Sequence, residues 1–330
     1  MNCHPYLHHL SRRALSTLAL GALFAYALPA VAQGTFPSKP VKIVAPFSAG
    51  SGVDAIARIY ARHMANDLKT SVIVENRDGA GGMIGAAYAA KQPADGYTLL
   101  VATTPFVVGP ISQGNAGYDP LKDFMAVGRL ATNPLALAVN PSVPAKTMGE
   151  LVAYAKANPG KLTYASSGPG TPSQLEMEFL KSRLGVDIRE IPYKSNGQAL
   201  TDTISGTVDM YYTVQSTTLS NVQSGKLRVL GVGALRRTQA LPDAPTVAQA
   251  AGLAGYESQV WYGLVVPAGT PAEVVARLNA ALVHTAQQPA VIEGVRKLGF
   301  EPSPSTEAEF TRTMTQEAEK AAAMLKAAQK

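Results

Sequence analysis

Cysteine and histidine are scarce in this sequence, and their scarcity removes several classes of site. The single cysteine, Cys3, falls in a segment that we expect to be removed, so the mature chain has no disulfide, no thiolate metal site and no cysteine nucleophile. Three of the five histidines fall in the same segment, which leaves His63 and His284, both isolated and outside any recognised signature. We therefore expect no catalytic residue, no bound metal and no cofactor.

The sequence also has no apolar run long enough for a membrane helix. The apolar run at residues 14–27 is about 14 residues long, whereas crossing a bilayer takes roughly 20. Arg12 and Arg13 precede this run, and the small residues 30–32 follow it, which is the pattern of an export signal cleaved after Ala32. We expect export to the periplasm, by the Sec or the twin-arginine route. A retained anchor or a buried N-terminal helix is the alternative.

Blocks of basic residues are missing as well. The formal net charge is +6, and it falls to +4 when Arg12 and Arg13 leave with the export signal. The remaining Lys and Arg residues form no run that would follow a phosphate backbone. We expect no nucleic-acid partner, and we expect the protein to act as a monomer.

What the sequence does contain is an alternation of strands and helices. Residues 41–46, 71–75 and 98–102 are predicted strands, and residues 53–68 and 83–90 are predicted helices. Because these strands are almost entirely apolar, we expect a parallel sheet covered on both faces.

A second series of the same kind begins near Leu135. Its predicted strands are at residues 162–165, 186–191, 208–212 and 227–232. One predicted helix begins with a capping box at residues 147–150, and two more lie at residues 172–184 and 197–204. A strand at residues 261–266 and helices after Pro271, after Pro289 and from about Glu307 complete the chain. Chain crossings near residues 133–134 and near Tyr256 predict two lobes, one of residues 33–133 with 256–330 and one of residues 134–255, joined by a hinge.

Four glycine-containing turns that follow predicted strands are the candidate binding elements. They span residues 46–54, 75–85, 166–171 and 192–197. Glycine lets a ligand approach the backbone, and the first turn of a helix has unpaired N–H groups with a partial positive charge. Such turns can hold a carboxylate or a phosphate without a basic side chain. For any single turn, an ordinary strand–helix connection remains the alternative.

The first turn also fits another class of protein. Residues 50–55 match the relaxed dinucleotide-binding pattern G-x-G-x-x-A, and Glu75 lies about 20 residues on, where an acid would hold a ribose hydroxyl. Pro46 and the export signal argue against a dinucleotide-binding enzyme. Asp54 and Asp209 either cap helices or line the cleft.

Short stretches along the whole mature chain resemble one known family in their order and sequence. They are residues 36–40 (FPSKP), 46–54, 74–85, 95–100 (DGYTLL), 166–171, 193–194, 225–228 (GKLR), 241–246 (LPDAPT), 261–263 (WYG) and 267–271 (PAGTP). In these motifs the chain resembles the substrate-binding proteins of the tripartite tricarboxylate transporter family, the Bug proteins. The resemblance implies an α/β fold like that of type II periplasmic binding proteins, with two doubly wound lobes and a ligand cleft at the hinge.

The resemblance and the turns together give the expected binding residues. The first two turns and the end of the third strand would face the ligand from one lobe, and the other two turns from the second. The expected residues are Phe47, Ser48, Ala49, Gly50, Ser51, Asp54, Gly81, Gly82, Met83, Thr103, Thr104, Ser166, Ser167, Gly168, Thr171, Tyr193, Lys194 and Asp209. The chain departs from the family's common residues at Ser51, Met83, Gln174 and Ser195, so the ligand of a relative cannot be assumed.

These observations favour a binding protein over an enzyme. We expect it to capture a small organic anion, a carboxylated metabolite, and to deliver it to the membrane subunits of a transporter. The alternative is a sensor whose ligand-bound form is recognised by a membrane receptor; neighbouring genes would separate the two.

Overall fold

The computed structural model describes residues 36–114, 116–168 and 171–328. The expected export signal lies outside these residues. The chain divides into two units at Ser38, and the second unit, from Lys39 on, contains every helix and strand described below. No helix among the described residues is long and apolar enough to cross a membrane.

The first group of strands follows the order β2-β1-β3-β9-β4. Their bounds are β1 Val41–Ala45, β2 Val72–Asn76, β3 Thr98–Thr103, β9 Gln259–Pro267 and β4 Phe124–Val139, and the short β10 Glu301–Pro302 pairs with β4. The first three strands are parallel, as the sequence predicts, and their carboxyl ends therefore share one edge of the sheet. The strands β9, β4 and β10, whose direction the sequence did not predict, run antiparallel to their neighbours.

The second group of strands pairs with the other end of β4. Its members are β5 Thr163–Ser166, β6 Arg189–Pro192, β7 Met210–Val214 and β8 Arg228–Val232. Here β5 pairs parallel to both β6 and β7, while β4 pairs antiparallel to β7 and β8. The carboxyl ends of β5, β6 and β7 therefore form a second common edge.

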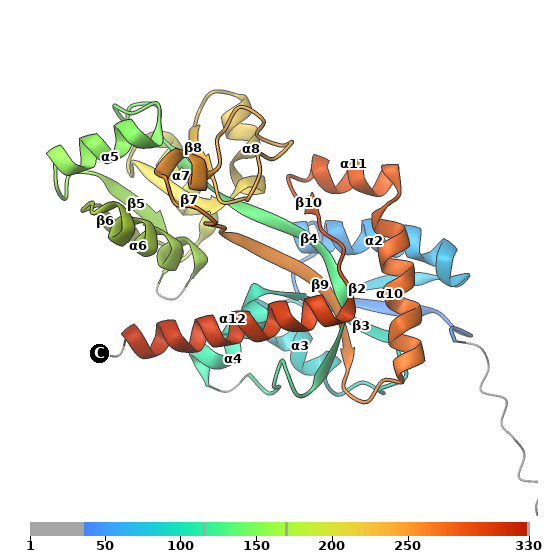
Figure 1. Cartoon of the computed structure of the whole chain (residues 1–330). Coiled ribbons are helices and arrows are strands. Elements are labelled where there is room, and N and C mark those ends of the chain that lie inside the picture. The colour runs from blue at the N-terminus through green and yellow to red at the C-terminus, as the bar shows by residue number, and fades with distance from the viewer. Residues whose placement is uncertain (1–35, 115, 169–170, 329–330) are drawn as a thin grey trace, which may run out of the picture. The chain divides into compact units, whose positions relative to one another are not determined.

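The two groups are joined by β4 and β9, which lie side by side between them in Figure 1. Asn133 pairs with Val260 and Pro134 with Gln259, and from Leu135 onward β4 pairs with β7 and β8. The crossing expected near residues 133–134 therefore lies within a continuous strand, and the one expected near Tyr256 lies just before β9 begins at Gln259. A proline in the run made β4 hard to predict, since proline cannot donate to a β-ladder.

Helices flank both groups of strands (Figure 1). Those of the first group are α2 Gly52–Leu68, α3 Met83–Ala89, α4 Thr104–Gln113, α10 Ala272–Ala286, α11 Pro289–Lys297 and α12 Glu307–Ala328, with the 3₁₀ turn η1 Ala80–Gly82. Those of the second group are α5 Met148–Ala157, α6 Pro172–Leu184, α7 Asn196–Ser205, α8 Gln215–Gln223 and α9 Val247–Ala251. Each group has its own apolar core, which makes the strand ends at its edge rigid supports for a site.

The helix α2 shows how the sequence specifies such an element. Ile56, Tyr60, Met64 and Leu68 recur at helical spacing, and all four are buried. Ser51 caps the start, because its hydroxyl accepts the amide of Asp54 at 3.2 Å. The helix therefore begins immediately after β1, with its first turn at the sheet edge.

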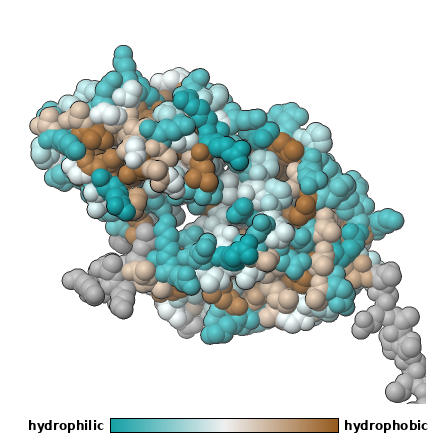
Figure 2. All heavy atoms as spheres, in the orientation of Figure 1, coloured by the Kyte–Doolittle hydropathy of each residue, from teal (hydrophilic) through white to brown (hydrophobic). Residues whose placement is uncertain are grey.

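Exposed apolar side chains are scattered. Figure 2 shows that on the face in view the hydrophobic residues form small groups separated by hydrophilic ones. The large exposed apolar residues are Ile73, Ile84, Leu121, Phe179 and Leu235. Single exposed apolar residues are normal for a protein surface and mark no partner on their own.

Candidate functional site

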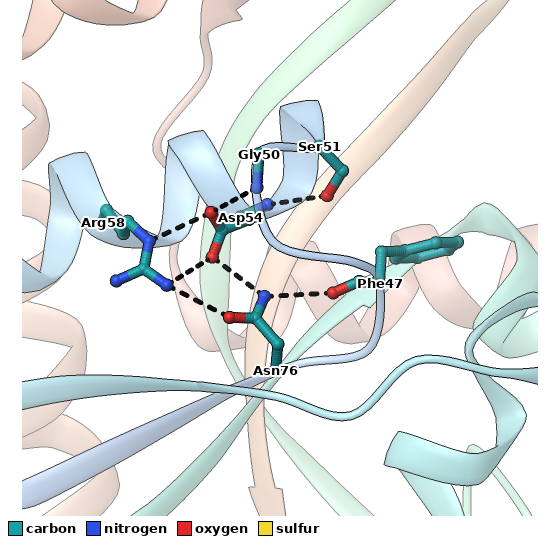
Figure 3. A network of polar contacts seen from close by, with 6 residues as sticks. All are labelled: Phe47, Gly50, Ser51, Asp54, Arg58 and Asn76. Carbon is teal, nitrogen blue, oxygen red and sulfur yellow. Dashed lines mark hydrogen bonds and ion pairs between the residues drawn. The ribbon is translucent and has the colours of Figure 1, made fainter.

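The turn between β1 and α2 is organised around the carboxylate of Asp54 (Figure 3). One carboxylate oxygen accepts the amide of Gly50 at 2.9 Å and the Nε of Arg58 at 3.0 Å. The other accepts the Nδ2 of Asn76 at 2.9 Å and lies 2.9 Å from a guanidinium nitrogen of Arg58. Asn76 also donates to the carbonyl of Phe47 at 3.0 Å. Asp54 therefore holds the shape of the turn, and its oxygens are occupied within the protein.

This network determines the charge of Asp54. Burial by itself would raise the pKa of this carboxyl, but the hydrogen bonds from Arg58, from the Gly50 amide and from Asn76 outweigh it and lower the pKa to about 2. The carboxylate is thus ionised at neutral pH, and Arg58 balances its negative charge. Without that balance, an anion bound near the turn would meet an uncompensated like charge.

The backbone amides of this turn fall into two sets. Those of Gly50, Ser51, Asp54 and Ala55 donate within the protein, to the Asp54 carboxylate, the Ser48 carbonyl, the Ser51 hydroxyl and the Ser51 carbonyl respectively. Among the described residues, the amides of Gly52 and Val53 have no hydrogen-bond partner. These two donors lie in the first turn of a 17-residue helix, where the partial positive charge of the helix is greatest.

The second glycine turn packs against the first. Gly81 and Gly82 have φ angles of 64° and 97°, which favour glycine, and a Cβ on Gly82 would lie 3.4 Å from the ring of Phe47. A Cβ on Gly85 would lie 2.8 Å from both Pro46 and the carbonyl of Arg77. Ser48 donates to the carboxylate of Asp78. The two turns therefore form one surface at the edge of the sheet.

Met83 is buried beneath this surface. A Cβ on Gly109 of α4 would come within 3.1 Å of its sulfur, so the methionine fills the space between α3 and α4.

The end of β3 adds two buried threonines to the same edge. Thr103 is the last residue of β3, and Thr104 is the first of α4. Thr104 is 6% exposed, and its hydroxyl has no hydrogen-bond partner among the described residues. Because buried hydroxyls are nearly always hydrogen-bonded, this one is a candidate for pairing with a ligand.

A hollow of about 240 Å³ opens at the start of α2. Its lining comes from four segments: Gly50, Ser51, Gly52 and Ala55 from the first turn, Ser216 and Thr217 from α8, and Leu298 and Phe300 from the turn before β10. The first turns of α2 and α8 thus open onto the same space from the two groups of strands. Of these lining residues the sequence predicted Gly50 and Ser51 as binding residues; it did not predict Gly52, Ala55 or the four residues from α8 and the turn before β10. The polar run that follows β7 was the only signal for α8.

The start of α8 is fixed to the first group by side-chain bonds. Asn133 of β4 donates to the hydroxyl of Ser216 at 2.7 Å, and Gln215 donates to the carbonyl of Gly299 at 3.0 Å. Gln215 and Asn133 are fully buried. This side of the hollow therefore lies beside the strands that join the two groups.

In the second group, the turn that follows β5 has few free backbone donors. The amide of Ser167 donates to the hydroxyl of Ser173, that of Gly168 to the hydroxyl of Ser166, and that of Thr171 to the carbonyl of Gly168. The expectation of unpaired amides is wrong for these three residues, because nearby serine side chains and a local turn satisfy them.

Side chains take the place of these amides at the same edge. Ser167 and Tyr211 both donate to the Oδ1 of Asn196, at 2.5 and 3.1 Å. The Tyr193 hydroxyl donates to Asp202 at 2.9 Å, and burial followed by this bond raises the pKa of Tyr193 to about 12. Lys194 is exposed and forms no ion pair with a described residue.

The structure separates Asp209 from the other expected residues. Its carboxylate accepts the amide and the hydroxyl of Thr163 at 2.7 and 2.8 Å. Thr163 is the first residue of β5, so Asp209 lies at the opposite end of the parallel strands from Ser166 and Ser167. It ties β5 to β7 and does not join the edge where the turns meet.

The residues of the alternative predictions also have structural partners. Glu75 forms an ion pair with Lys42 at 2.6 Å and another with Arg77, which occupy the carboxylate that a ribose would need. His63 contacts Gln288 at 2.8 Å, and His284 contacts Asp67 at 2.9 Å. Within the described ranges, no three His, Cys, Asp or Glu side chains are grouped so that they could hold a metal ion.

Comparison with known proteins gives one consistent family. Residues 56–329 match the model of the TctC family, described as the tripartite tricarboxylate transporter family receptor. A UPF0065 protein from the tcbD–tcbE intergenic region of Pseudomonas sp. is 38% identical over 289 residues, with 88% of this chain and 86% of the relative covered. BugT of Bordetella pertussis is 33% identical over 274 residues, with 82% and 84% covered.

Solved structures agree with this result. The periplasmic binding protein BugD has 33% identity and a TM-score of 0.71, with 89% of this chain and 98% of that chain covered. A protein of R. palustris with adipate has 32% identity and a TM-score of 0.74, with 87% and 97% covered. MatC from Rhodopseudomonas palustris, with bound malate, has 29% identity and a TM-score of 0.69, with 87% and 99% covered.

Proposed function

Because the chain belongs to the tripartite tricarboxylate transporter receptor family, we propose that it captures a small carboxylated metabolite in the periplasm and delivers it to the membrane subunits of such a transporter. The observation that carries this proposal is the hollow at the start of α2, where the amides of Gly52 and Val53 have no partner among the described residues. A carboxylate seated there would accept both N–H groups and would be stabilised by the positive end of the helix.

Two further features support an anion at this place. The charge of Asp54 is balanced by Arg58, so this carboxylate places no uncompensated negative charge behind the N–H groups. At the same sheet edge, outside the lining of the hollow, the buried hydroxyl of Thr104 has no partner among the described residues and is a candidate donor to a ligand enclosed when the lobes close. The neighbours with adipate and malate make a carboxylate the class of ligand to test first.

The particular ligand depends on residues at which this chain departs from the family's common pattern. Ser51 caps α2 with its own hydroxyl, and Met83 fills space between α3 and α4. Both residues change the volume and polarity available near the two turns. We therefore propose the ligand as a class, a small organic acid.

We propose that ligand capture involves closure of two lobes, residues 33–133 with 256–330 and residues 134–255. The paired strands β4 and β9 would form the hinge, because Asn133 and Pro134 pair across from Val260 and Gln259 where the strands pass from one group to the other. Closure excludes water and strengthens the hydrogen bonds to the ligand.

The remaining parts of the proposal follow from the same role. We propose that the export signal is cleaved after Ala32 and that the mature protein is a monomer in the periplasm. We also propose that it binds no nucleic acid and catalyses no reaction. The pattern of residues 12–32 supports export, and the absence of basic runs supports the exclusion of nucleic acid.

A thermal-shift screen of mono-, di- and tricarboxylates, amino acids and uncharged analogues tests the ligand class. A true ligand at a hundredfold excess over its Kd should stabilise the protein by about 2.7 kcal/mol. If only neutral or cationic compounds raise the melting temperature, the proposal is wrong.

Thr104→Val makes the test specific to the site. Because the Thr104 hydroxyl is buried and unpaired among the described residues, this substitution should leave the stability of the free protein unchanged or raise it, while weakening carboxylate binding. Thr270→Val is the matched control, since Thr270 is also buried but its hydroxyl donates to the carbonyl of Pro267 at 2.8 Å. The control should lose stability and keep its affinity for the ligand.

A further inference from the structure

The two sides of the proposed site offer a ligand different kinds of group. On the α2 side the donors are backbone amides, those of Gly52 and Val53. On the other side the amides of Ser167, Gly168 and Thr171 are occupied. The amides of Gly197 and Gln198, in the first turn of α7, have no hydrogen-bond partner among the described residues. Side chains therefore add to these backbone donors in recognising the far end of a ligand.

Asn196 is an exposed side chain at that edge whose amide contacts two hydroxyl groups. It is the first residue of α7, and its Oδ1 accepts hydrogen bonds from Ser167 at the end of β5 and from Tyr211 of β7. We assign the contacting amide atom as the oxygen, with the Ser167 hydroxyl as its donor; the Tyr211 hydroxyl lies 3.1 Å from the same oxygen and 3.0 Å from the Ser167 hydroxyl. Tyr211 is fully buried and cannot rotate away. With this assignment the carbonyl of the amide is directed inward, toward the two hydroxyl groups.

The consequence is that the amide nitrogen faces outward. Its two N–H groups have no acceptor among the residues that the structure describes, and Asn196 is exposed. Lys194, two residues earlier in the same turn, is also exposed and carries only donors. The free groups of this turn are therefore hydrogen-bond donors.

The nearby acidic groups do not reverse this conclusion. Glu190 accepts the hydroxyl of Ser166 at 2.5 Å and pairs in register with Tyr164, whose side chain belongs to the core on the α6 face of the sheet. Tyr211 belongs to the core on the α7 face. Asp202 is held by Tyr193 at 2.9 Å and by Gln198 at 2.7 Å. Neither the Glu190 nor the Asp202 carboxylate is hydrogen-bonded to the Asn196 amide.

We propose that Asn196 is a specificity-determining residue, which selects ligands whose far end is a hydrogen-bond acceptor, such as a second carboxylate, over ligands whose far end is an ammonium group. The inference rests on the proposed function, since the first carboxylate is assigned to the start of α2. An ammonium group at the far end would meet the N–H groups of Asn196 and the charge of Lys194, and would leave all of these donors unpaired.

The test compares ligands that differ only at the far end. Titration calorimetry on the purified protein would use the straight-chain dicarboxylates from succinate to pimelate, the ω-amino acid of each chain length and the corresponding monocarboxylate. At the chain length that binds best, the dicarboxylate should bind about 10- to 100-fold more tightly than the ω-amino acid. The monocarboxylate should fall between them.

Asn196→Asp is the decisive variant, because it keeps an acceptor for Ser167 and Tyr211 but replaces the outward N–H groups with an acceptor of similar shape. It should weaken binding of the dicarboxylate by about 10-fold or more and strengthen binding of the ω-amino acid. Gln223→Glu is the matched control, with the same charge change on an exposed side chain at the far end of α8. The control should leave the ratio of the two affinities unchanged.

Tyr211→Phe provides a second variant that tests the orientation of the amide. It removes one of the two donors that hold Oδ1, so the preference for the dicarboxylate should fall while the monocarboxylate affinity stays constant. A purely structural role would lower the melting temperature and leave this preference intact.

Failure of the inference and failure of the proposed function are distinguishable. If no carboxylate binds, the proposed function is wrong. If carboxylates bind but the ω-amino acids bind as tightly as the dicarboxylates, or Asn196→Asp leaves their ratio unchanged, the role of Asn196 is refuted and the carboxylate site at α2 stands.

Discussion

Replacing Asp54 with asparagine should lower the free energy of unfolding at neutral pH by about 2 kcal/mol. The magnitude follows from the pKa of Asp54, which is lowered from 3.8 to about 2, since each pKa unit corresponds to about 1.4 kcal/mol. The side chain of Asp54 is only 5% exposed, so solvent screens its interactions little. The Asp54→Asn side chain would also turn an N–H group toward donors that now bond a carboxylate, which adds to the loss.

The dependence on pH separates this effect from a general packing defect. Because the pKa of Asp54 is lower in the folded protein, its contribution is fully present above about pH 4 and is lost as the pH falls from about 4 to 2. Urea denaturation of both proteins at a series of pH values would measure the difference directly. The gap between the native protein and Asp54→Asn should be widest at neutral pH and should shrink below pH 4.

Glu293→Gln is the control, because Glu293 and Lys297 form an ion pair with the same spacing along a helix, but both side chains are exposed. Its urea midpoint should not change measurably. A gap between the native protein and Asp54→Asn that stays constant with pH, or one no larger than that of the control, would refute the view that this carboxylate organises the turn.

Two further substitutions test the packing that supports the site. Gly263→Ala in β9 would place a Cβ 2.2 Å from the ring of the fully buried Phe310, so it should destabilise the protein by about 1–3 kcal/mol or more in the same urea assay. Gly149→Ala lies on the exposed surface of α5, where the nearest atom is 4.0 Å away, and should be neutral or slightly stabilising. Lys320→Met should lower the free energy of unfolding by about 1–2 kcal/mol. The Glu176 carboxylate is 11% exposed and lies 2.7 Å from the Lys320 ammonium, so the substitution leaves it with the Tyr256 hydroxyl as its remaining partner. An unchanged urea midpoint would show that water replaces the lysine without cost.

The elements that the sequence predicts best are those with a clear period and clear ends. The helix at residues 172–184 is predicted at its observed bounds, and α2 begins one residue earlier than expected. Thr147 does cap α5, but the reciprocal bond expected from Glu150 goes to the amide of Lys146. The complete capping box is at Thr246 and Gln249, where no helix was expected.

The missed elements lack such local signals. In β4 the pattern is interrupted by Gly128 and Pro134, and its 16 residues are held as strand by β9, β7 and β8, which are distant in sequence. Two prolines, one at the start of α4 and Pro110 inside it, made this helix hard to predict. The polar α8 is fixed by Gln215 and Ser216, which bond residues 299 and 133. Tertiary contacts specify these elements, and a local pattern cannot show them.

The site was predictable to the extent that it depends on chain order. In a parallel sheet the turns after successive strands share an edge, which is why the turns after β1, β2 and β3 come together. Chain order does not say which amides remain free. Serine hydroxyls occupy the amides of Ser167 and Gly168, while Asp54 occupies that of Gly50, and only side-chain positions reveal this.

The difference between the two edges has a consequence for how ligand choice is divided within the molecule. Donors at the start of α2 belong to the backbone, so a substitution of Val53 by another non-proline residue leaves the N–H group in place. The opposite edge adds the side-chain donors of Asn196 and Lys194 to the backbone amides of Gly197 and Gln198, so a single substitution there changes one donor into an acceptor or removes it. In the proposed binding mode, binding of the first carboxylate is thus insensitive to sequence at the start of α2, whereas individual side chains adjust the chemistry accepted at the other end. A receptor built in this way can change its ligand without losing its preference for acids, because the two properties depend on different groups.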